Sequence, residues 1–424
     1  FRRWCRKVGV DVESGDVDHI FSFLDKQNNG LVDWNNFASA LEADIRLDLV
    51  RQQTLRLPLR NEGEVRIRGG FTHVLVVVRV RPLSKKEKKA HAERRNKQDN
   101  MPATCVQVSA HGNGHHLVGI TKPAKAGAVL KSQAKPKRNF FAFDKVFGPS
   151  STTSQIYQTV ILPNRLVERY LDGISVTVFA YGATGSGKSF TMMGSKYCSP
   201  SSSAVASQPG IVQQLLTDVF SMSQSRERGV SMEFSVSYLE IYNETLQDLL
   251  VDDSRGDDRT KKKKKLILCE DPKSHVVDVL GLTKKRVTCT SDVMKLVNYG
   301  NKRRIMASTA ANEFSSRSHA VLQLSYRRRE KLARGGKREK SSMLTMVDLA
   351  GSERAAQTLN RGKRLREGAN INRSLLALGS CIKALAQRGS RGQRSSKVRP
   401  KFRDSKLTLM LKNSLEGRSV LVML

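Results

Sequence analysis

Residues 180–192 read AYGATGSGKSFTM, and from Gly182 this stretch fits the pattern G-x-x-x-x-G-K-[ST]. It overlaps the end of the apolar run ISVTVFAYG, which we expect to form a buried strand. Where a strand, a glycine loop and a helix start follow one another, backbone amides converge on phosphate oxygens. In such a loop Lys188 reaches the β- and γ-phosphates, and the Ser189 hydroxyl binds Mg²⁺. The stretch therefore predicts a nucleotide site, and a plain Gly/Ser-rich turn is the alternative.

The composition points to an acidic partner. The 424 residues include 74 Lys and Arg against 39 Asp and Glu, a formal net charge of +35. Such a charge suits nucleic acid, an anionic membrane or an acidic protein surface. Six cysteines without a C-x-x-C pair argue against a zinc site or a disulfide framework and predict reduced thiols in an intracellular protein. No apolar run approaches membrane-spanning length, so we expect no membrane insertion.

We expect three segments along the chain. Residues 1–60 show two amphipathic helical patterns and predict a small all-α unit, residues 61–70 form a charged linker, and residues 71–424 alternate strands with helices. This alternation favours a three-layer α/β domain with a mainly parallel central sheet flanked by helices. Because the chain begins at Phe1 without Met and stops inside the apolar run SVLVML, we expect it to be a piece of a longer protein.

The elements of the α/β segment follow from the apolar periodicity and the turn residues. Strands are predicted at 73–80, 174–181, 231–242, 319–326, 343–349 and 419–424. Helices are predicted at 154–171, 211–221, 292–304, 370–387 and 406–415. Surface insertions are predicted at 85–138, 199–208 and 252–265, which are rich in Lys and Arg, in Ser, and in charge of both signs.

Two later stretches supply groups that hydrolysis of a phosphate requires. NEFSSRSH, residues 312–319, concentrates hydroxyls, an amide and a guanidinium, and VDLAGSE, residues 347–353, places Asp348 at the end of an apolar strand. An Asp in that position holds Mg²⁺ through water, and the Gly351 amide is a donor for the γ-phosphate. Alone, each stretch has a plain alternative, a phosphorylatable loop or an ordinary strand exit. Their order behind the glycine loop favours a hydrolytic site.

The stretches GATGSGKS, NEFSSRSH and DLAGSE, followed by EGANINRSLLALGSCIKAL and FRDSKLT, resemble the kinesin motor domain from residue 71 to the end of the chain. In kinesins these are the P-loop, switch I, switch II, the main microtubule-facing helix, and the loop and helix after it. The resemblance implies a microtubule-stimulated ATPase with ATP and Mg²⁺, located in the cytoplasm on microtubules, including those of the spindle or axoneme. It is compatible with a dimer formed through regions outside this chain.

Within the family, the sequence is most similar to kinesin-8, whose members walk toward plus ends and shorten them. A kinesin-13 depolymerase is the alternative, because its basic insertion also follows the first strand. One departure is SLEGRS, residues 414–419, where Glu416 and Gly417 replace a usual double glycine.

The resemblance implies roles for single residues. Ser189 and Ser316 are implied as Mg²⁺ ligands, with Asp348 holding a Mg²⁺-bound water. Arg317 and Glu353 are implied to pair and to position and deprotonate the attacking water. The other catalytic positions are Gly351, Asn312 and Ser315. RVRP is implied to clamp the adenine, and the nucleotide-binding positions are Arg79, Arg81, Pro82, Gly182, Ala183, Thr184, Gly185, Ser186, Gly187, Lys188, Ser189 and Phe190.

The acidic surface of tubulin is a partner that suits the net charge, and attraction to it would speed encounter and weaken with salt. On the resemblance, the microtubule-binding positions are Arg354, Arg388, Arg394, Lys397, Lys401, Arg403 and Lys406. For any one of these residues the alternative is a solvated surface side chain.

The stretch DKQNNGLVDWNN, residues 25–36, resembles an EF-hand loop with Gly30 at the sharp turn. Its ligand positions are Asp25, Gln27, Asn29, Leu31 (through its carbonyl), Asp33 and Asn36. Two carboxylates remain, and Asn36 cannot give the bidentate contact of a Glu. We therefore expect a structural hand that binds Ca²⁺ weakly and holds none at physiological levels.

Two other functions compete with the motor. A non-motile microtubule-binding scaffold with a structural nucleotide is disfavoured, because such a protein has no physical need for the whole hydrolytic set. A P-loop ATPase acting on nucleic acid would explain the charge but neither NEFSSRSH nor FRDSKLT, and we find no clear stacking platform of aromatic and basic residues. We therefore expect no nucleic-acid partner.

Overall fold

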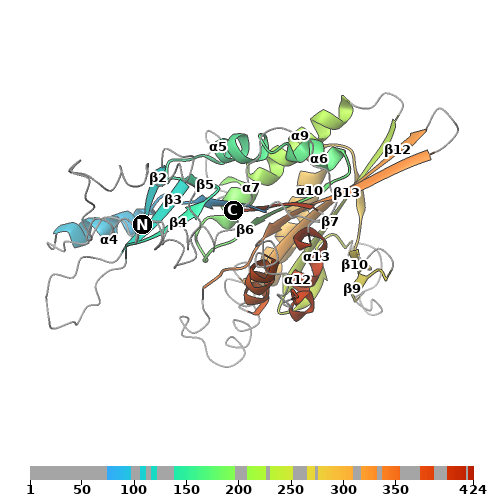
Figure 1. Cartoon of the computed structure of the whole chain (residues 1–424). Coiled ribbons are helices and arrows are strands. Elements are labelled where there is room, and N and C mark those ends of the chain that lie inside the picture. The colour runs from blue at the N-terminus through green and yellow to red at the C-terminus, as the bar shows by residue number, and fades with distance from the viewer. Residues whose placement is uncertain are drawn as a thin grey trace, which may run out of the picture. The chain divides into compact units, whose positions relative to one another are not determined.

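The structure is a computed structural model that describes residues 74–96, 106–110, 116–121, 138–195, 208–225, 230–251, 265–272, 276–308, 317–331, 337–353, 373–385, 399–416 and 419–424 (Figure 1). Residues 1–73, with the predicted EF-hand-like segment and linker, lie outside these ranges. In the described ranges, no helix combines the length and the apolar character needed to cross a membrane.

A nine-stranded sheet forms the centre of the described residues. Its strands are β1 Val74–Arg79, β5 Lys145–Phe147, β6 Ser175–Ala180, β7 Val230–Tyr242, β8 Thr245–Asp248, β11 Lys285–Val287, β12 His319–Lys331, β13 Lys337–Asp348 and β14 Ser419–Met423. The order is β11-β7-β12-β13-β6-β14-β1-β5, and β8 pairs with β7. The pairings from β13 to β5 are parallel, while those from β11 to β13 are antiparallel.

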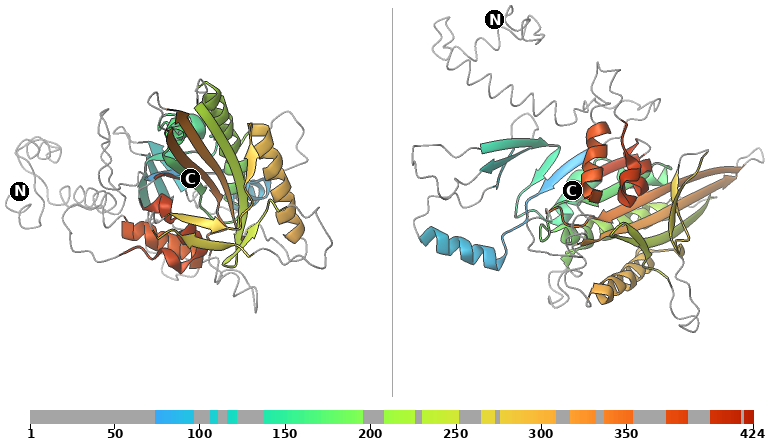
Figure 2. Two further views of the ribbon diagram at one scale, coloured as in Figure 1. Left: turned by 90° about the vertical axis from the view of Figure 1, so that its right-hand side faces the viewer. Right: turned by 90° about the horizontal axis from the view of Figure 1, so that it is seen from below.

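Helices cover both faces of the sheet, which confirms the predicted three-layer α/β class (Figure 2). The helices are α4 Lys85–Asn96, α5 Thr153–Ile156, the π-helix η1 Tyr157–Ile161, α6 Leu166–Leu171, α7 Lys188–Met193, α9 Ile211–Gln224, α10 Thr290–Ser308, the 3-10 helix η5 Phe402–Asp404, α12 Lys406–Met410, α13 Lys412–Leu415 and an unlabelled helix at 373–385. Along β6, Val176 and Val178 face the core beneath α6, α7, α9 and α10, whereas Phe179 faces the core beneath α12, α13 and the helix at 373–385. Successive strand residues thus bury against opposite layers.

The predicted helix at 154–171 is wrong as a continuous element. The structure divides it into α5, η1 and α6, and Arg165 before α6 adopts a left-handed backbone with φ of 51°. The break coincides with Pro163, which has no amide to donate inside a helix. The predicted helix at 406–415 is likewise divided, at Leu411 between α12 and α13.

The predicted surface insertion at 85–138 contains regular structure in its described parts. These are α4 and the strands β2 Val106–Ala110 and β3 His116–Thr121, and β3 pairs with β4 Arg138–Phe143 to complete a three-stranded antiparallel sheet. A second small sheet pairs β9 Ile267–Glu270 with β10 Val277–Leu280. The high charge of the surrounding sequence conceals these short strands.

Strands β12 and β13 are longer than predicted. Charged residues extend their pairing beyond the apolar stretch, and the carboxylate of Glu339 on β13 forms ion pairs with Arg327 and Arg329 on β12, at 3.1 and 3.2 Å. Opposite charges on neighbouring strands support the ladder without apolar burial.

Two helical glycines give a matched test of this packing. A Cβ at Gly300 on α10 would lie 2.5 Å from Cδ1 of Tyr238, whereas one at Gly379, on an exposed part of the helix at 373–385, meets no described atom within 4 Å. We expect Gly300→Ala to lower the free energy of unfolding by about 1–3 kcal/mol through overpacking. Gly379→Ala should raise it by about 0.5–1 kcal/mol, because alanine favours the helix. Urea denaturation of both variants measures this, and equal effects would contradict the packing around Gly300.

Candidate functional site

The glycine loop, which we define as residues 181–187, connects β6 to α7. Gly187 precedes α7 with φ of 100°, and Gly185 has φ of 75°, so both positions use a backbone region that side chains disfavour. The loop lies beside the carboxyl end of β13, because parallel pairing matches Asp348 with Ala180. The two loops that follow these strands therefore meet at one edge of the sheet.

Lys188 holds its ammonium group against the glycine loop. Its Nζ donates hydrogen bonds to the carbonyl oxygens of Gly182 at 2.8 Å and Ala183 at 2.9 Å. Burial lowers the pKa of Lys188, while the carboxylates of Asp348 and Glu353 act in the opposite direction. The site thus contains a half-buried lysine facing two carboxylates, the electrostatic setting that an anionic phosphate chain with a cation would complete.

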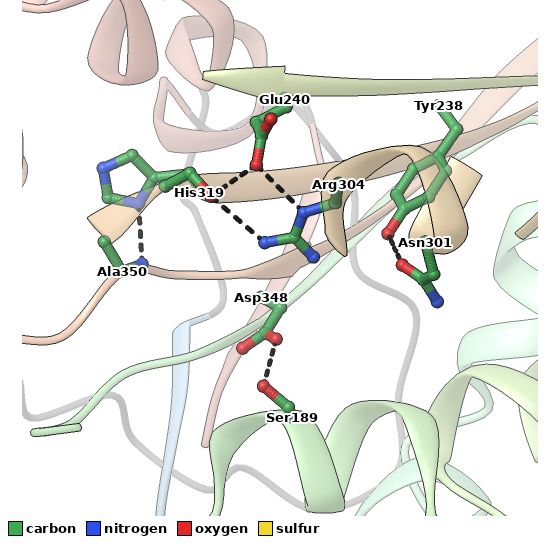
Figure 3. A network of polar contacts seen from close by, with 9 residues as sticks. Ser189, Tyr238, Glu240, Asn301, Arg304, His319, Asp348 and Ala350 are labelled. Atoms are coloured by element: carbon green, nitrogen blue, oxygen red, sulfur yellow. Dashed lines mark hydrogen bonds and ion pairs between the residues drawn. The ribbon is translucent and has the colours of Figure 1, made fainter. Parts of the chain in front are cut away.

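Ser189 and Asp348 meet where a metal ligand set is predicted (Figure 3). The Ser189 hydroxyl donates to Oδ2 of Asp348 at 2.5 Å. The other carboxylate oxygen, Oδ1, is buried and has no hydrogen-bond partner among the described residues. Burial raises the pKa of Asp348, and Ser189, Arg304 and Lys188 act against that rise. A buried carboxylate oxygen needs a partner, so these residues fit a Mg²⁺ ion with its water.

The DLAG loop, which we define as residues 349–353, is held against β6 and the glycine loop by hydrogen bonds from its backbone amides. Leu349 N–H donates to the Ala180 carbonyl at 3.3 Å, and Ser352 N–H donates to the Gly182 carbonyl at 3.1 Å. Between them, a Cβ at Gly351 would lie 2.3 Å from the Thr184 hydroxyl oxygen. A side chain at Gly351 would therefore displace the Thr184 hydroxyl and the Glu353 carboxylate, which meet at this point.

Glu353 closes the contact between the two loops. Thr184 donates its amide to Oε2 of Glu353 at 2.8 Å and its hydroxyl to Oε1. Burial acts to raise the pKa of Glu353, but the Thr184 hydrogen bonds and the charge of Lys188 outweigh it and lower the pKa. The structure therefore holds Glu353 as a carboxylate against the glycine loop.

The model of the kinesin motor domain matches residues 79–424. The chain belongs to the kinesin motor-domain family. Human Kinesin-like protein KIF19 is 38% identical over 351 residues, covering 83% of this chain and 31% of that protein. Kinesin-like protein KIN-8B of Arabidopsis thaliana is 38% identical over 352 residues, covering 83% and 38%. Kinesin-like protein KIP3 of Saccharomyces cerevisiae is 43% identical over 284 residues, covering 67% and 32%.

Solved kinesin structures have the same fold. A KIF14 structure with ADP in complex with a microtubule aligns with a TM-score of 0.63 at 32% identity, covering 83% of this chain and 88% of that one. The motor domain of the Kar3-like kinesin from Ashbya gossypii aligns with a TM-score of 0.59 at 30% identity, covering 83% and 91%. The chain spans about a third of the length of the relatives named above.

The expected adenine-side residues of the motor domain lie beside α7. Arg79 donates to the Thr191 hydroxyl at 2.9 Å, and its Cζ lies 5.2 Å from the centre of the Phe190 ring. Arg81 forms a bidentate ion pair with Glu87 of α4, in which its two terminal guanidinium nitrogens lie 2.8 and 2.6 Å from the carboxylate oxygens, and Pro82 is exposed. The structure thus brings Arg79 and Phe190 together, while Arg81 is engaged with α4.

Three predicted microtubule-binding residues are described. Lys401, Arg403 and Lys406 are exposed, and Arg403, with 83% of its side chain accessible, has a carboxylate oxygen of Glu270 at 3.5 Å. Arg317 is half-buried immediately before β12, and its pairing with Glu353 stays a prediction. The remaining predicted positions lie outside the described residues: Asn312, Ser315, Ser316, Arg354, Arg388, Arg394, Lys397, Asp25, Gln27, Asn29, Leu31, Asp33 and Asn36.

Sequence reasoning missed a buried ion pair behind the site (Figure 3). Nε of Arg304 on α10 lies 3.0 Å from Oε1 of Glu240 on β7, and the two side chains are 11% and 1% exposed. The Ser318 hydroxyl, next to Arg317, donates to the same Glu240 oxygen at 2.5 Å and accepts from Arg304 at 3.2 Å. The available signal was Glu240 itself, a charged residue within the apolar strand sequence SYLEIY.

His319 was also missed as a member of the site. Its Nδ1 accepts a hydrogen bond from the Ala350 amide at 3.0 Å, and its Nε2 lies 2.8 Å from the Ser374 hydroxyl. Burial, with help from the charges of Arg304 and Lys188, lowers the pKa of His319 to about 3. The imidazole is therefore neutral at physiological pH.

This lowered pKa predicts how acid affects stability. An unfolded histidine titrates near pH 6.5, so the unfolded chain takes up the proton first, and the stability due to neutral His319 is lost as pH falls from 6.5 toward 3. Between pH 7 and pH 5 we expect the titration of this one histidine to lower the free energy of unfolding by about 2 kcal/mol. In denaturation measured at several pH values, His319→Asn should lack that part of the decline. Parallel stability curves for the two proteins would contradict the assignment.

Proposed function

We propose that this chain is the catalytic part of an ATP-driven, microtubule-stimulated motor of the kinesin-8 type. The observation that supports it most is the meeting of Ser189 with Asp348, whose second oxygen is buried without a described partner. The relatives named KIN-8A and KIN-8B support the kinesin-8 type, and the KIF14 structures in complex with a microtubule support the partner. Location on cytoplasmic microtubules and shortening of their ends belong to the same proposal.

Each described residue of the site has a part in this reaction. Ser189 and Asp348 would hold Mg²⁺, Asp348 through a water, and Lys188 would bind the β- and γ-phosphates. When bound, Mg²⁺ neutralises the charge that develops on the transferred phosphoryl group. The half-buried Phe190 ring and the guanidinium of Arg79 would lie beside the base.

Glu353 would serve hydrolysis only after a rearrangement. Both of its carboxylate oxygens accept hydrogen bonds from Thr184, and its pKa is lowered. A carboxylate stabilised in this way is a weak base. We propose that Glu353 leaves Thr184 and pairs with Arg317 when the DLAG loop closes on ATP, so that it positions the water and accepts its proton. Gly351 would then offer its amide to the γ-phosphate, with Asn312, Ser315 and Ser316 completing the site.

The surface that meets the microtubule would include the described cations Lys401, Arg403 and Lys406, continued by Arg354, Arg388, Arg394 and Lys397. These cations contribute to the formal charge of +35, which suits an acidic surface. We propose a motor domain from residue 71 to 424, joined by a linker at 61–70 to an EF-hand-like segment at 1–60. With two carboxylates in its loop, that hand would be structural rather than a calcium sensor.

Two substitutions separate binding from hydrolysis. We expect Lys188→Ala to weaken binding of a fluorescent ATP analogue at least about tenfold, because it removes the cation that faces the phosphates. Glu353→Ala should leave that binding nearly unchanged and lower microtubule-stimulated turnover by about 100-fold or more, because this group acts in the hydrolytic step. Steady-state ATPase with and without microtubules measures the second effect.

Glu93→Ala, which removes an exposed carboxylate on α4, is the matched control and should behave as the wild type. A wild-type ATPase that microtubules do not stimulate would favour the non-motile scaffold. Full turnover in Glu353→Ala would remove that residue from the mechanism. Watching microtubule ends in the same reaction distinguishes a walking motor from a kinesin-13-like depolymerase.

A further inference from the structure

We propose that His319 is a positioning residue that couples the DLAG loop to the helix at 373–385 through two hydrogen bonds, one to Ala350 and one to Ser374. The role goes beyond the roles proposed above for the phosphate site. It rests on the proposed function for one point, the identification of the partner that binds the outer face of the helix.

The histidine lies where three segments of the chain converge. It is the first residue of β12, and Ala350 belongs to the loop after β13, which pairs with β12. Ser374 lies 55 residues further along the chain, near the start of the described helix. His319 and Ser374 are each 2% exposed, so water does not compete for these bonds. Figure 3 shows the imidazole directed at the Ala350 amide.

The hydrogen bonds fix the tautomer of the ring. Because the Ala350 amide is a donor, Nδ1 must be the unprotonated nitrogen. Nε2 therefore carries the proton and donates to the Ser374 hydroxyl. A doubly protonated ring would direct an N–H group at the Ala350 N–H, and the positive charges of Arg304 and Lys188 also oppose it. The ring is thus a neutral connector with one accepting end and one donating end.

At the accepting end lies the amide next to Gly351. The neighbouring amides of Leu349 and Ser352 donate to carbonyl groups of β6 and the glycine loop. Ala350 instead depends on a side chain that is itself tied to a helix in another layer. A displacement of His319 would therefore change the orientation of the peptide unit between Leu349 and Ala350, which directly precedes the unit that carries the Gly351 amide.

At the donating end lies a helix with two distinct faces. Leu375, Leu378 and Cys381 pack in the core beneath it, whereas Leu376 is 72% exposed, the largest exposed fraction among the large apolar side chains that the structure describes as exposed. Lys383 is exposed as well. An exposed leucine and a lysine on one helix suit a partner surface with apolar and acidic parts. The acidic partner that we propose above is the tubulin surface. Binding there would move the helix as a rigid body, and Ser374 would move with it.

A buried histidine with two satisfied nitrogens can also be a purely structural residue. The two roles differ in what they change. A structural residue contributes to the free energy of unfolding alone, whereas a coupling residue changes how strongly binding at the helix and binding at the phosphate site affect each other.

The test uses the full chain with three substitutions. Ser374→Ala removes the hydroxyl, and Ser374→Thr keeps it as the matched control. His319→Asn keeps an acceptor near the Nδ1 position for Ala350 but is too short to reach Ser374. We expect Ser374→Ala and His319→Asn each to lower the ratio of microtubule-stimulated to basal ATPase by about 5- to 20-fold. Ser374→Thr should retain most of the ratio. The double variant, with Ser374→Ala and His319→Asn, should have a ratio no lower than that of His319→Asn alone.

A second measurement does not require microtubules. Hydrogen exchange of residues 373–385 is compared with and without Mg²⁺ and a non-hydrolysable ATP analogue. We expect the analogue to change exchange in the wild type and in Ser374→Thr, and to change it much less in Ser374→Ala. Melting temperatures of all variants show whether stability alone accounts for the effects.

The outcomes distinguish this inference from the proposed function. If microtubules do not stimulate the wild type but the exchange response is lost in Ser374→Ala, the proposed partner is wrong and the coupling stands. If the wild type is stimulated and Ser374→Ala keeps the same ratio and exchange response, the coupling is wrong and the proposed function stands. If hydrogen exchange of residues 373–385 in the wild type did not change when the ATP analogue binds, the coupling would also be wrong.

Discussion

The parallel pairing of β13 with β6 is the constraint on which the site depends. It matches Val347 with Phe179 and Asp348 with Ala180, so both strands end at the same level of the sheet. The glycine loop and the DLAG loop then leave the sheet side by side. Two contacts join the loops, Thr184 with Glu353 and Ser352 with Gly182, and next to them Ser189 of α7 contacts Asp348 at the end of β13. A register shift of one residue would turn Asp348 to the opposite face. The chemistry of the site is therefore set by strand pairing.

Buried polar groups around this edge of the sheet stabilise one arrangement of the side chains. Glu240 and Arg304 are buried together, and removing one member of such a pair leaves an uncompensated charge that costs about 3–5 kcal/mol. Ser318 completes the pair, which fixes the start of β12 next to His319. Two buried oxygens, Oδ1 of Asp348 and Oε2 of Glu240, have no hydrogen-bond partner among the described residues. Of these two oxygens, the one of Asp348 lies beside Ser189, where a cation and phosphates would bind.

The parts of the fold that could be predicted are those encoded by neighbouring residues. The glycine loop, the apolar core of β6 and the Asp at the end of β13 each lie within a dozen residues, so periodicity and spacing identify them. The Glu240–Arg304 and His319–Ser374 contacts join residues 64 and 55 positions apart, and no local pattern encodes them. The helix break near Arg165 and the sheet of β2, β3 and β4 were missed because apolar periodicity continued through the first and charge masked the second.

The most direct test of the central claim measures how Mg²⁺ holds the nucleotide. Release of a fluorescent ADP is followed after Mg²⁺ is chelated, in the wild type and in Asp348→Asn, which replaces one carboxylate oxygen by an amide. If strand pairing presents Ser189 and Asp348 as a metal site, chelation should speed release from the wild type by about tenfold or more, while Asp348→Asn should release quickly whether or not Mg²⁺ is present. If release of ADP from Asp348→Asn depended on Mg²⁺ as strongly as release from the wild type, the account would be wrong.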